Sequence, residues 1–196
     1  MRREHSIEPA YFEALYKDRS DPWHFETSAY EAAKYDATLA ALPGDRFASA
    51  LEVGCANGVL TTRLAQRCDS LLAVDVSDTA LTAARARCVA QSNVRVERRR
   101  LPAEAPVGTF DLVLLSEVVY YWDSADISRL ADYLRTAVLP GGHILLVHWI
   151  GETDYPKSGD DAIAELQVAL GQAVTVVRSD RYDAYRLDLW RFGAAG

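Results

Sequence analysis

The sequence predicts an α/β protein with a doubly wound, mostly parallel sheet, on three observations. Short apolar runs alternate along the chain with segments of helical periodicity, which is typical of βα units. A glycine-containing turn follows the first run, and an acidic residue ends the second. Two alternating runs near the end of the chain predict an antiparallel β-hairpin at one edge, which brings the expected sheet to seven strands.

The expected elements follow one another from strand to helix along the chain. Ser77 is the expected N-cap of the second helix. The sequence Leu139-Pro140-Gly141-Gly142 is expected to end the third helix and to start the fifth strand. The expected strands are 50–53, 71–75, 94–98, 112–115 and 144–148, with 174–178 and 185–192 forming the hairpin around 179–183. The expected helices are 58–68, 77–91, 124–138 and 160–171.

Length and composition favour one domain over residues 1–196, made of an N-terminal helical cap (1–45) and a core (46–196). A net charge of −7 argues against nucleic acid as a partner, and the basic run 98–100 is either a solvated loop or a small basic patch. No apolar run is long enough to span a membrane. We expect a cytoplasmic monomer or weak homodimer.

The three cysteines, Cys55, Cys68 and Cys88, have no spacing typical of metal ligands. We therefore expect reduced thiols and no bound metal.

The turn after the first strand predicts a nucleotide site. Gly54 and Gly58 let the backbone approach a ligand closely, and the following helix directs its first N–H groups toward it. Asp75 ends the second strand within roughly 20 residues of Gly58, the interval at which a carboxylate reaches ribose hydroxyls. A dinucleotide fingerprint would need glycine where the chain has Ala56 and Val59, so NAD is disfavoured.

Glu52, Gly54 and Gly58 fit the pattern acid-x-Gly-x-Gly-x-Gly, with Ala56 in place of the middle glycine. With the segments 110–122 and 139–146, this pattern resembles class I S-adenosylmethionine (SAM) methyltransferases. The resemblance implies a Rossmann-like fold and SAM as cofactor, with S-adenosylhomocysteine (SAH) as product.

The segment Asp21-Pro22-Trp23-His24-Phe25-Glu26-Thr27-Ser28-Ala29-Tyr30-Glu31, together with the Ser-Glu-Val-Val-Tyr-Tyr loop at 116–121, resembles the nodulation protein S (NodS) branch. That branch N-methylates the free amine of a deacetylated chitin oligosaccharide.

Polar residues at the carboxyl ends of the strands are expected to meet at one edge of the sheet, where ligands bind in such folds. After the third strand, where the superfamily usually has an acid against the adenine, the chain reads Arg100-Leu101-Pro102, so backbone and apolar groups take that role. The expected cofactor-binding residues are Glu52, Gly54, Cys55, Ala56, Gly58, Asp75, Val76, Leu101, Pro102, Ser116 and Glu117, with Trp23 and Tyr30 from the cap.

Methyl transfer needs orientation and exclusion of water rather than a metal or a protein nucleophile. An amine acceptor must lose a proton, and His148 is a candidate base because its ordinary pKa suits that task. The other candidate catalytic residues are Glu117, as an anchor for the acceptor, and Tyr120. Alternatively, His148 is a structural residue bonded to the backbone, and Glu117 is placed by a helix dipole.

Two further segments have alternative interpretations. The aromatic residues of the cap either pack on the sheet or close over SAM and stack on a sugar. The acidic residues Glu152, Asp154, Asp160 and Asp161 either attract a cationic amine or form a solvated loop.

The expected function is SAM-dependent N-methylation of an amine on a small acceptor, namely an amino sugar or a deacetylated chitooligosaccharide. A small-molecule O-methyltransferase and a non-catalytic SAM-binding protein are the alternatives.

Overall fold

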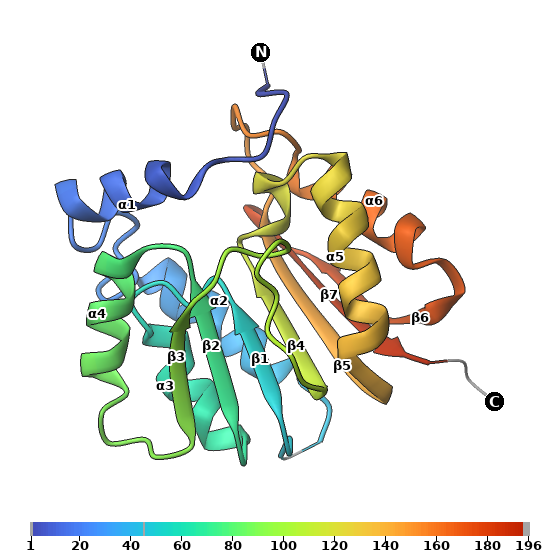
Figure 1. Ribbon diagram of the computed structural model, residues 1–196, viewed down its shortest axis with the longest axis horizontal. Helices are drawn as coiled ribbons and strands as arrows, with labels where there is room; N and C mark the ends of the chain where they lie inside the picture. The colour runs from blue at the N-terminus through green and yellow to red at the C-terminus, as the bar shows by residue number, and fades with distance from the viewer. Residues whose placement is uncertain (1, 45, 194–196) are drawn as a thin grey trace. The chain divides into compact units, whose positions relative to one another are not determined.

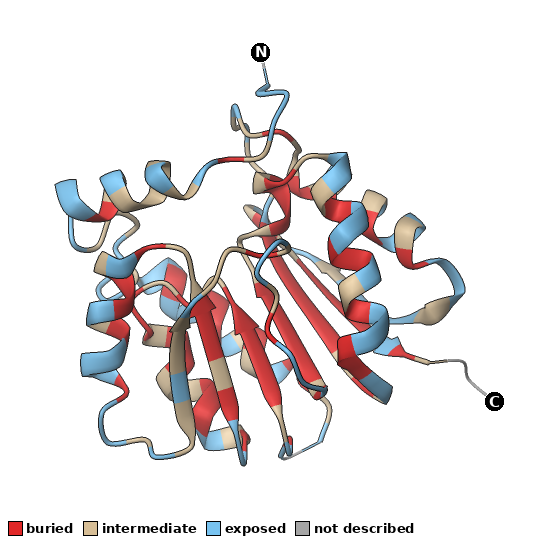
Figure 2. Ribbon diagram, in the orientation of Figure 1, coloured by how far each residue is buried: buried red, intermediate tan, exposed pale blue. Residues whose placement is uncertain are grey.

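The contacts of the chain divide it into two units. The computed structural model describes residues 2–44 and 46–193. The N-terminal unit is Glu8–Arg99, and the C-terminal unit contains the described residues from Arg100 onward together with residues 2–7. In both units most strands are buried, whereas the edge strands at 94–98 and 174–181 are partly or fully exposed, and the longer helices have both buried and exposed residues (Figure 2). The predicted organisation as a single domain with a cap and a core stays a prediction.

The N-terminal unit contains three parallel strands in the order β3-β2-β1 (Figure 1). Val53, the last residue of β1, pairs with Val74, so both strands deliver the chain to the same edge. Helix α4 begins after Ser77, whose side chain accepts a hydrogen bond from the N–H of Ala80. The elements are α1 (Pro9–Asp18), α2 (Ala29–Ala40), β1 (Ala50–Val53), α3 (Val59–Leu64), η1 (Ala65–Arg67), β2 (Leu71–Asp75), α4 (Asp78–Arg87) and β3 (Val94–Arg98).

The C-terminal unit contains four strands in the order β4-β5-β7-β6. β4 and β5 are parallel, whereas β7 is antiparallel to both β5 and β6. Helices α5 and α6 begin at caps made by Asp123 and Ser158. The elements are β4 (Phe110–Ser116), η2 (Val119–Tyr121), α5 (Ser124–Ala137), β5 (Val138–Trp149), α6 (Gly159–Leu170), η3 (Gly171–Ala173), β6 (Val174–Arg181) and β7 (Tyr185–Phe192).

The fifth strand starts earlier than the sequence predicts. β5 begins at Val138, and the Pro-Gly-Gly sequence lies inside an irregular first part of the strand. The register jumps there, since Phe110 pairs with Val138 but Leu112 pairs with His143. Gly142 makes the irregularity possible, because a Cβ at this position would lie 2.9 Å from the carbonyl oxygen of Leu139.

The hairpin also differs from the expected one. Strand β6 continues through Arg181 instead of ending at residue 178, so the turn is shorter than expected. Strand β4 is also longer than expected, running from Phe110 to Ser116 instead of 112–115, whereas β1, β2, β3 and β7 have the predicted bounds. The α/β class is confirmed. Helices α1 and α2 occupy the segment predicted as a cap. In residues 2–44 and 46–193, no helix has both the length and the apolar character needed to cross a membrane.

Candidate functional site

The turn after β1 has three residues with left-handed backbone conformations. Gly54 has φ +83°, Ala56 has φ +50° and Gly58 has φ +81°. A Cβ at Gly58 would lie 3.0 Å from the Cα of Ala84 in α4, so a side chain there is disfavoured by tight packing as well as by conformation. Ala56 stands where the expected pattern has its middle glycine, and it adopts a positive φ despite its Cβ.

Asp75, at the end of β2, accepts three hydrogen bonds from backbone amides. One carboxylate oxygen accepts from the N–H of Ala56 at 3.0 Å, and the other accepts from the N–H of Val76 at 2.7 Å and of Ser77 at 3.0 Å. Burial raises the pKa of Asp75, while these amides oppose the rise. A carboxylate has about four acceptor positions, so about one is left for an external donor. The geometry therefore leaves about one acceptor position for a direct hydroxyl contact, and the contact of Asp75 with ribose stays a prediction.

Two buried polar atoms near the turn have no hydrogen-bond partner among the described residues. They are Oε2 of Glu52 and Oδ1 of Asn57, both on side chains that are almost fully buried. Burial raises the pKa of Glu52 to about 7, which the Thr61 hydroxyl partly opposes and the charge of Asp75 reinforces. Unpaired polar atoms of this kind call for a polar ligand or water. The turn therefore fits a nucleoside cofactor with hydroxyl and amine groups.

The cap residues Trp23 and Tyr30 have different surroundings. Trp23 stacks on Phe25 with ring centroids 5.6 Å apart and meets Tyr16 edge-on, so it belongs to a packed aromatic group. Tyr30 is exposed on α2, with Nζ of Lys34 5.3 Å from its ring. Trp23 therefore packs against other aromatic residues of the cap. Packing on the sheet and the cofactor role of Trp23 and Tyr30 both stay predictions.

In the C-terminal unit, Glu117 follows β4 with a strained backbone. Its φ is +56°, which is rare for a residue with a long side chain and is found mostly at functional sites. Its Oε2 accepts hydrogen bonds from the Tyr120 hydroxyl at 2.6 Å and from the N–H of Trp149 at 2.7 Å. The structure thus brings together the predicted catalytic residues Glu117 and Tyr120, and adds Trp149.

The Tyr120 phenol is a proton donor in this arrangement. Burial and the adjacent charge of Glu117 raise the pKa of Tyr120 well above its usual value, so it keeps its proton at neutral pH. Its ring stacks on Tyr155, with centroids 5.5 Å apart, and meets His148 edge-on. Tyr120 therefore orients Glu117 through a donated hydrogen bond.

His148 is fully buried in β5, and its Nε2 accepts a hydrogen bond from the N–H of Val119 at 3.1 Å. Because that lone pair is already used, Nε2 is a poor acceptor for a substrate proton, and the geometry favours the structural alternative. The role of His148 as a base stays a prediction. Its bond to Val119 holds the start of η2, which carries Tyr120.

Leu101 and Pro102 lie in a turn closed by Arg100 and Glu104. The N–H of Arg100 donates to the Glu104 carboxylate at 3.0 Å, and the N–H of Glu104 donates to the carbonyl of Arg100 at 2.7 Å. Leu101 is buried and Pro102 is partly exposed. Contact of this turn with adenine stays a prediction, as does that of Ser116, the last residue of β4.

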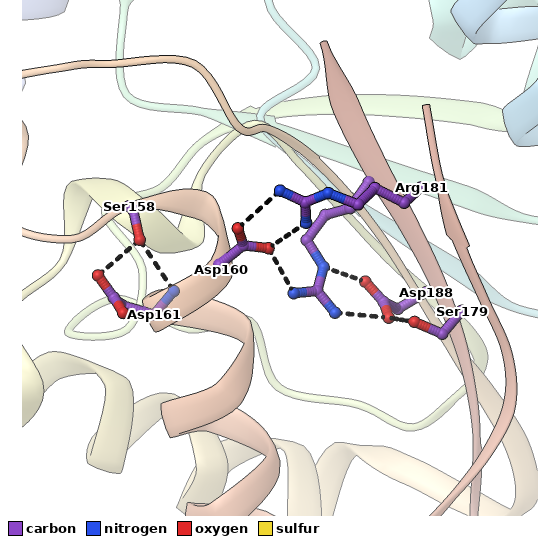
Figure 3. A network of polar contacts seen from close by, with 7 residues as sticks. Ser158, Asp160, Asp161, Ser179, Arg181 and Asp188 are labelled. Atoms are coloured by element: carbon purple, nitrogen blue, oxygen red, sulfur yellow. Dashed lines mark hydrogen bonds and ion pairs between the residues drawn. The ribbon is translucent and has the colours of Figure 1, made fainter. Parts of the chain in front are cut away.

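Of the four acidic residues at 152–161, Asp154 and Asp160 pair with arginines, and Asp160 and Asp161 lie in the first turn of α6. Asp160 accepts hydrogen bonds from Arg181 at 2.8 and 3.0 Å and from Arg186 at 2.9 Å (Figure 3). Asp154 pairs with Arg3 at 3.1 Å. These ion pairs weaken the interpretation that the loop attracts a cationic amine.

Several residues of these sites were missed by the sequence analysis. Trp149 and Tyr155 belong to the surroundings of Glu117, and Glu13 contacts Ser77 and Thr79 beside Asp75. No motif marks them, and only the N-cap character of Ser77 was visible. Within the described residues, no group of three or more His, Cys, Asp or Glu side chains is arranged to hold a metal.

Comparison with known proteins places these features in a family. The family model for nodulation protein S (NodS) matches residues 13–139. A nodulation protein S of Sinorhizobium fredii is 31% identical over 152 residues, which cover 76% of this chain and 70% of that relative. The chain spans about half the length of the first two curated relatives that it matches, which are also nodulation proteins S.

Two solved structures share the fold. One is a Pseudomonas syringae protein with a provisional assignment as a methyltransferase; it is 38% identical, with TM-score 0.74 and coverage of 84% of this chain and 99% of that chain. The other is the N-methyltransferase NodS of Bradyrhizobium japonicum WM9 in complex with SAH; it is 22% identical, with TM-score 0.82 and coverage of 95% and 99%. The second likeness shows the fold alone. The expected family, enzyme class and cofactor agree with these relatives.

Proposed function

The chain belongs to the nodulation protein S family, and on that premise we propose that the protein transfers a methyl group from SAM to the amine of a small acceptor. The observation that carries the proposal is the glycine turn with Asp75. Its left-handed residues, the remaining acceptor position of Asp75 and the unpaired Oε2 of Glu52 match what a nucleoside cofactor with hydroxyl and amine groups requires. An amino sugar or deacetylated chitooligosaccharide is the acceptor we propose, because the named relatives are nodulation proteins S.

The cofactor role is assigned residue by residue. The backbone of the turn from Gly54 to Gly58 approaches the cofactor, and Asp75 accepts a ribose hydroxyl. Val76 supplies an apolar side chain next to that contact. Leu101 and Pro102 supply apolar surface for the adenine ring.

Bound SAM supplies a methyl group on a positively charged sulfur, so that the sulfur–carbon bond breaks as the nitrogen–carbon bond forms. The protein contributes orientation and a water-excluded environment, which reduce the barrier without a protein nucleophile. The acceptor nitrogen must be uncharged at attack and gives up one proton overall. Glu117, held by Tyr120 and the amide of Trp149, attracts the ammonium form of the acceptor, and the proton that the nitrogen gives up passes to water.

Incubation with SAM labelled on the methyl group tests the proposal. Three mixtures are compared, with glucosamine oligomers, with hydroxylated phenols and with no acceptor. Label in the amine-bearing product alone supports N-methylation, whereas label in the phenols alone identifies an O-methyltransferase. Binding of SAH without turnover on either class identifies a non-catalytic SAM-binding protein. The cytoplasmic location and the monomeric or weakly dimeric state stay predictions.

A further inference from the structure

Glu13, in helix α1, reaches across to the start of helix α4. Its carboxylate accepts hydrogen bonds from the Ser77 hydroxyl at 2.7 Å, from the Thr79 hydroxyl at 2.8 Å and from the Thr79 backbone N–H at 3.2 Å. These bonds lower the pKa of Glu13 to about 2. The contact joins residues 64 and 66 positions apart in the sequence. Glu13 is therefore a charged residue at every physiological pH and is held in one place.

The same short segment of chain also holds Asp75. The amides of Val76 and Ser77 donate to Asp75, the amide of Thr79 donates to Glu13, and the amide of Ala80 donates to the Ser77 hydroxyl. Two carboxylates thus occupy the amino end of α4, where the first N–H groups of a helix lack partners within it. Loss of Glu13 removes the hydrogen bonds that hold Ser77 and Thr79. Ser77 and the preceding Val76 are the residues whose amides orient Asp75.

A second carboxylate from the same N-terminal stretch contacts the glycine turn. Glu26 accepts hydrogen bonds from the guanidinium of Arg87 and from Nδ2 of Asn57 at 3.4 Å, while Nε of Arg87 donates to the carbonyl of Asn57 at 2.9 Å. The Asp21 carboxylate fixes this stretch by accepting from the N–H groups of Phe25 and Glu26 at 2.9 and 3.0 Å. Asn57 lies between Ala56 and Gly58, so this contact braces the glycine turn.

We propose that Glu13 and Glu26 are positioning residues for the cofactor, each bracing one of the two loops that hold it. The inference rests on the proposed function, since it assigns these loops to SAM. Glu13 has the larger effect, because its side chain is 25% exposed and makes three hydrogen bonds, whereas Glu26 is 47% exposed and its ion pair is screened by solvent.

Calorimetric titration with SAH measures the effect directly. We expect Glu13→Ala to raise the Kd for SAH about tenfold, the effect of a lost charged hydrogen bond. Glu13→Gln retains one acceptor oxygen and gives a smaller rise, and Glu26→Gln raises Kd about twofold to threefold. At saturating SAM, kcat of the variants stays near the wild-type value while KM for SAM rises.

Two variants act as matched controls on the same segment. Lys17→Met removes the ion pair of Glu13 with Lys17 but leaves its contacts to α4, and Asp36→Asn removes an ion pair with Arg63 that touches neither loop. We expect both to retain the wild-type Kd.

Thr79→Val is a second test variant for the case that Glu13→Ala does not fold. It removes one hydroxyl donor to Glu13, and we expect it to raise the Kd for SAH.

The outcomes separate the two proposals. If the wild type itself does not bind SAH, the proposed function fails. If the wild type binds SAH and the folded Glu13 and Thr79 variants bind it equally well, the positioning role is overturned. A variant that lowers the melting temperature without changing Kd well below that temperature shows a merely structural role, and this too overturns the inference.

Discussion

Asp75 and Glu117 are carboxylates at the ends of two strands, but they are held in different ways. Asp75 is fixed by three backbone amides, two of them from the residues that directly follow it. Glu117 is fixed by one phenol and one amide from another strand, on a backbone with positive φ. A carboxylate held by local amides is preserved whenever the local chain folds, whereas one held by distant side chains depends on the packing of several elements. The two sites should therefore respond differently to substitution.

The largest expected effect concerns a third carboxylate, Glu52, which is held mainly by burial. Its pKa rises from 4.5 to about 7 on folding, so the folded state binds more protons than the unfolded state across that interval. The free energy of unfolding therefore falls as the pH rises from 4.5 to 7, by about 3 kcal/mol from this residue, and stays at the lower value above.

Urea unfolding of the wild type and Glu52→Gln at a series of pH values measures this dependence. In Glu52→Gln, the free energy of unfolding should fall much less between pH 4.5 and 7 than in the wild type. Glu13 gives the matched comparison, because its lowered pKa changes stability only below pH 4.5, where stability is lost as the pH falls toward 2. An equal decline in wild type and Glu52→Gln would contradict the role assigned to burial.

Substitution of Asp75 should mainly lower the affinity for the cofactor. Asp75→Ala is expected to weaken SAM binding by about 1.5–3 kcal/mol, the contribution of charged hydrogen bonds, while NAD shows no measurable binding to the wild type. Calorimetry with SAM, SAH and NAD provides the measurement. Unchanged SAM affinity in the variant would remove Asp75 from the site.

His148 lies next to the carboxylate held by distant groups and has an intermediate expected effect. His148→Ala leaves the N–H of Val119 without its acceptor and should cost about 1–3 kcal/mol of stability. His148→Gln can accept that hydrogen bond through its amide oxygen, and we expect it to restore both stability and kcat. If both variants lose kcat by about 10²–10⁴-fold and flatten the pH–rate profile, His148 is a base after all.

The smallest effect is expected for Glu117→Gln. The amide still accepts a hydrogen bond from Tyr120, so the fold is retained, but the attraction for a cationic acceptor is lost. KM for an amine acceptor should rise about threefold to tenfold, which corresponds to about 1 kcal/mol. Steady-state kinetics with an amine and with an uncharged acceptor provide the measurement. A rise of the same size for the uncharged acceptor would show that the charge of Glu117 is not what matters.

The difference between the two carboxylates also explains what could be predicted from the sequence. Strands β1, β2 and β3 have the predicted bounds, because apolar runs and the glycine turn are local signals. Two of the three amide contacts of Asp75, those from Val76 and Ser77, are local too. Trp149, by contrast, reaches Glu117 across 32 positions, and Glu13 reaches Thr79 across 66, so no local pattern predicts either contact.

Two other features were hidden for conformational reasons. Positive φ at Glu117 contradicts the preference of its residue type and is imposed by the surrounding structure. The sequence of Pro140, Gly141 and Gly142 is typical of a turn, so it does not predict the early start of β5. In the structure these residues lie within β5, at the irregularity in its pairing with β4.

The alanine at position 56 shows how a sequence can depart from a glycine pattern at a net cost smaller than the backbone strain alone. In the folded protein, its left-handed conformation costs about 1–2 kcal/mol relative to glycine. In the denatured chain, however, alanine samples fewer conformations than glycine, which favours folding by about 0.4–1 kcal/mol. The gain in the denatured chain therefore offsets about half of the strain, and a net cost remains. The turn therefore loses less backbone entropy when it folds than a turn with glycine at this position. The N–H of Ala56, which donates to Asp75, belongs to a residue with fewer conformations in the denatured chain.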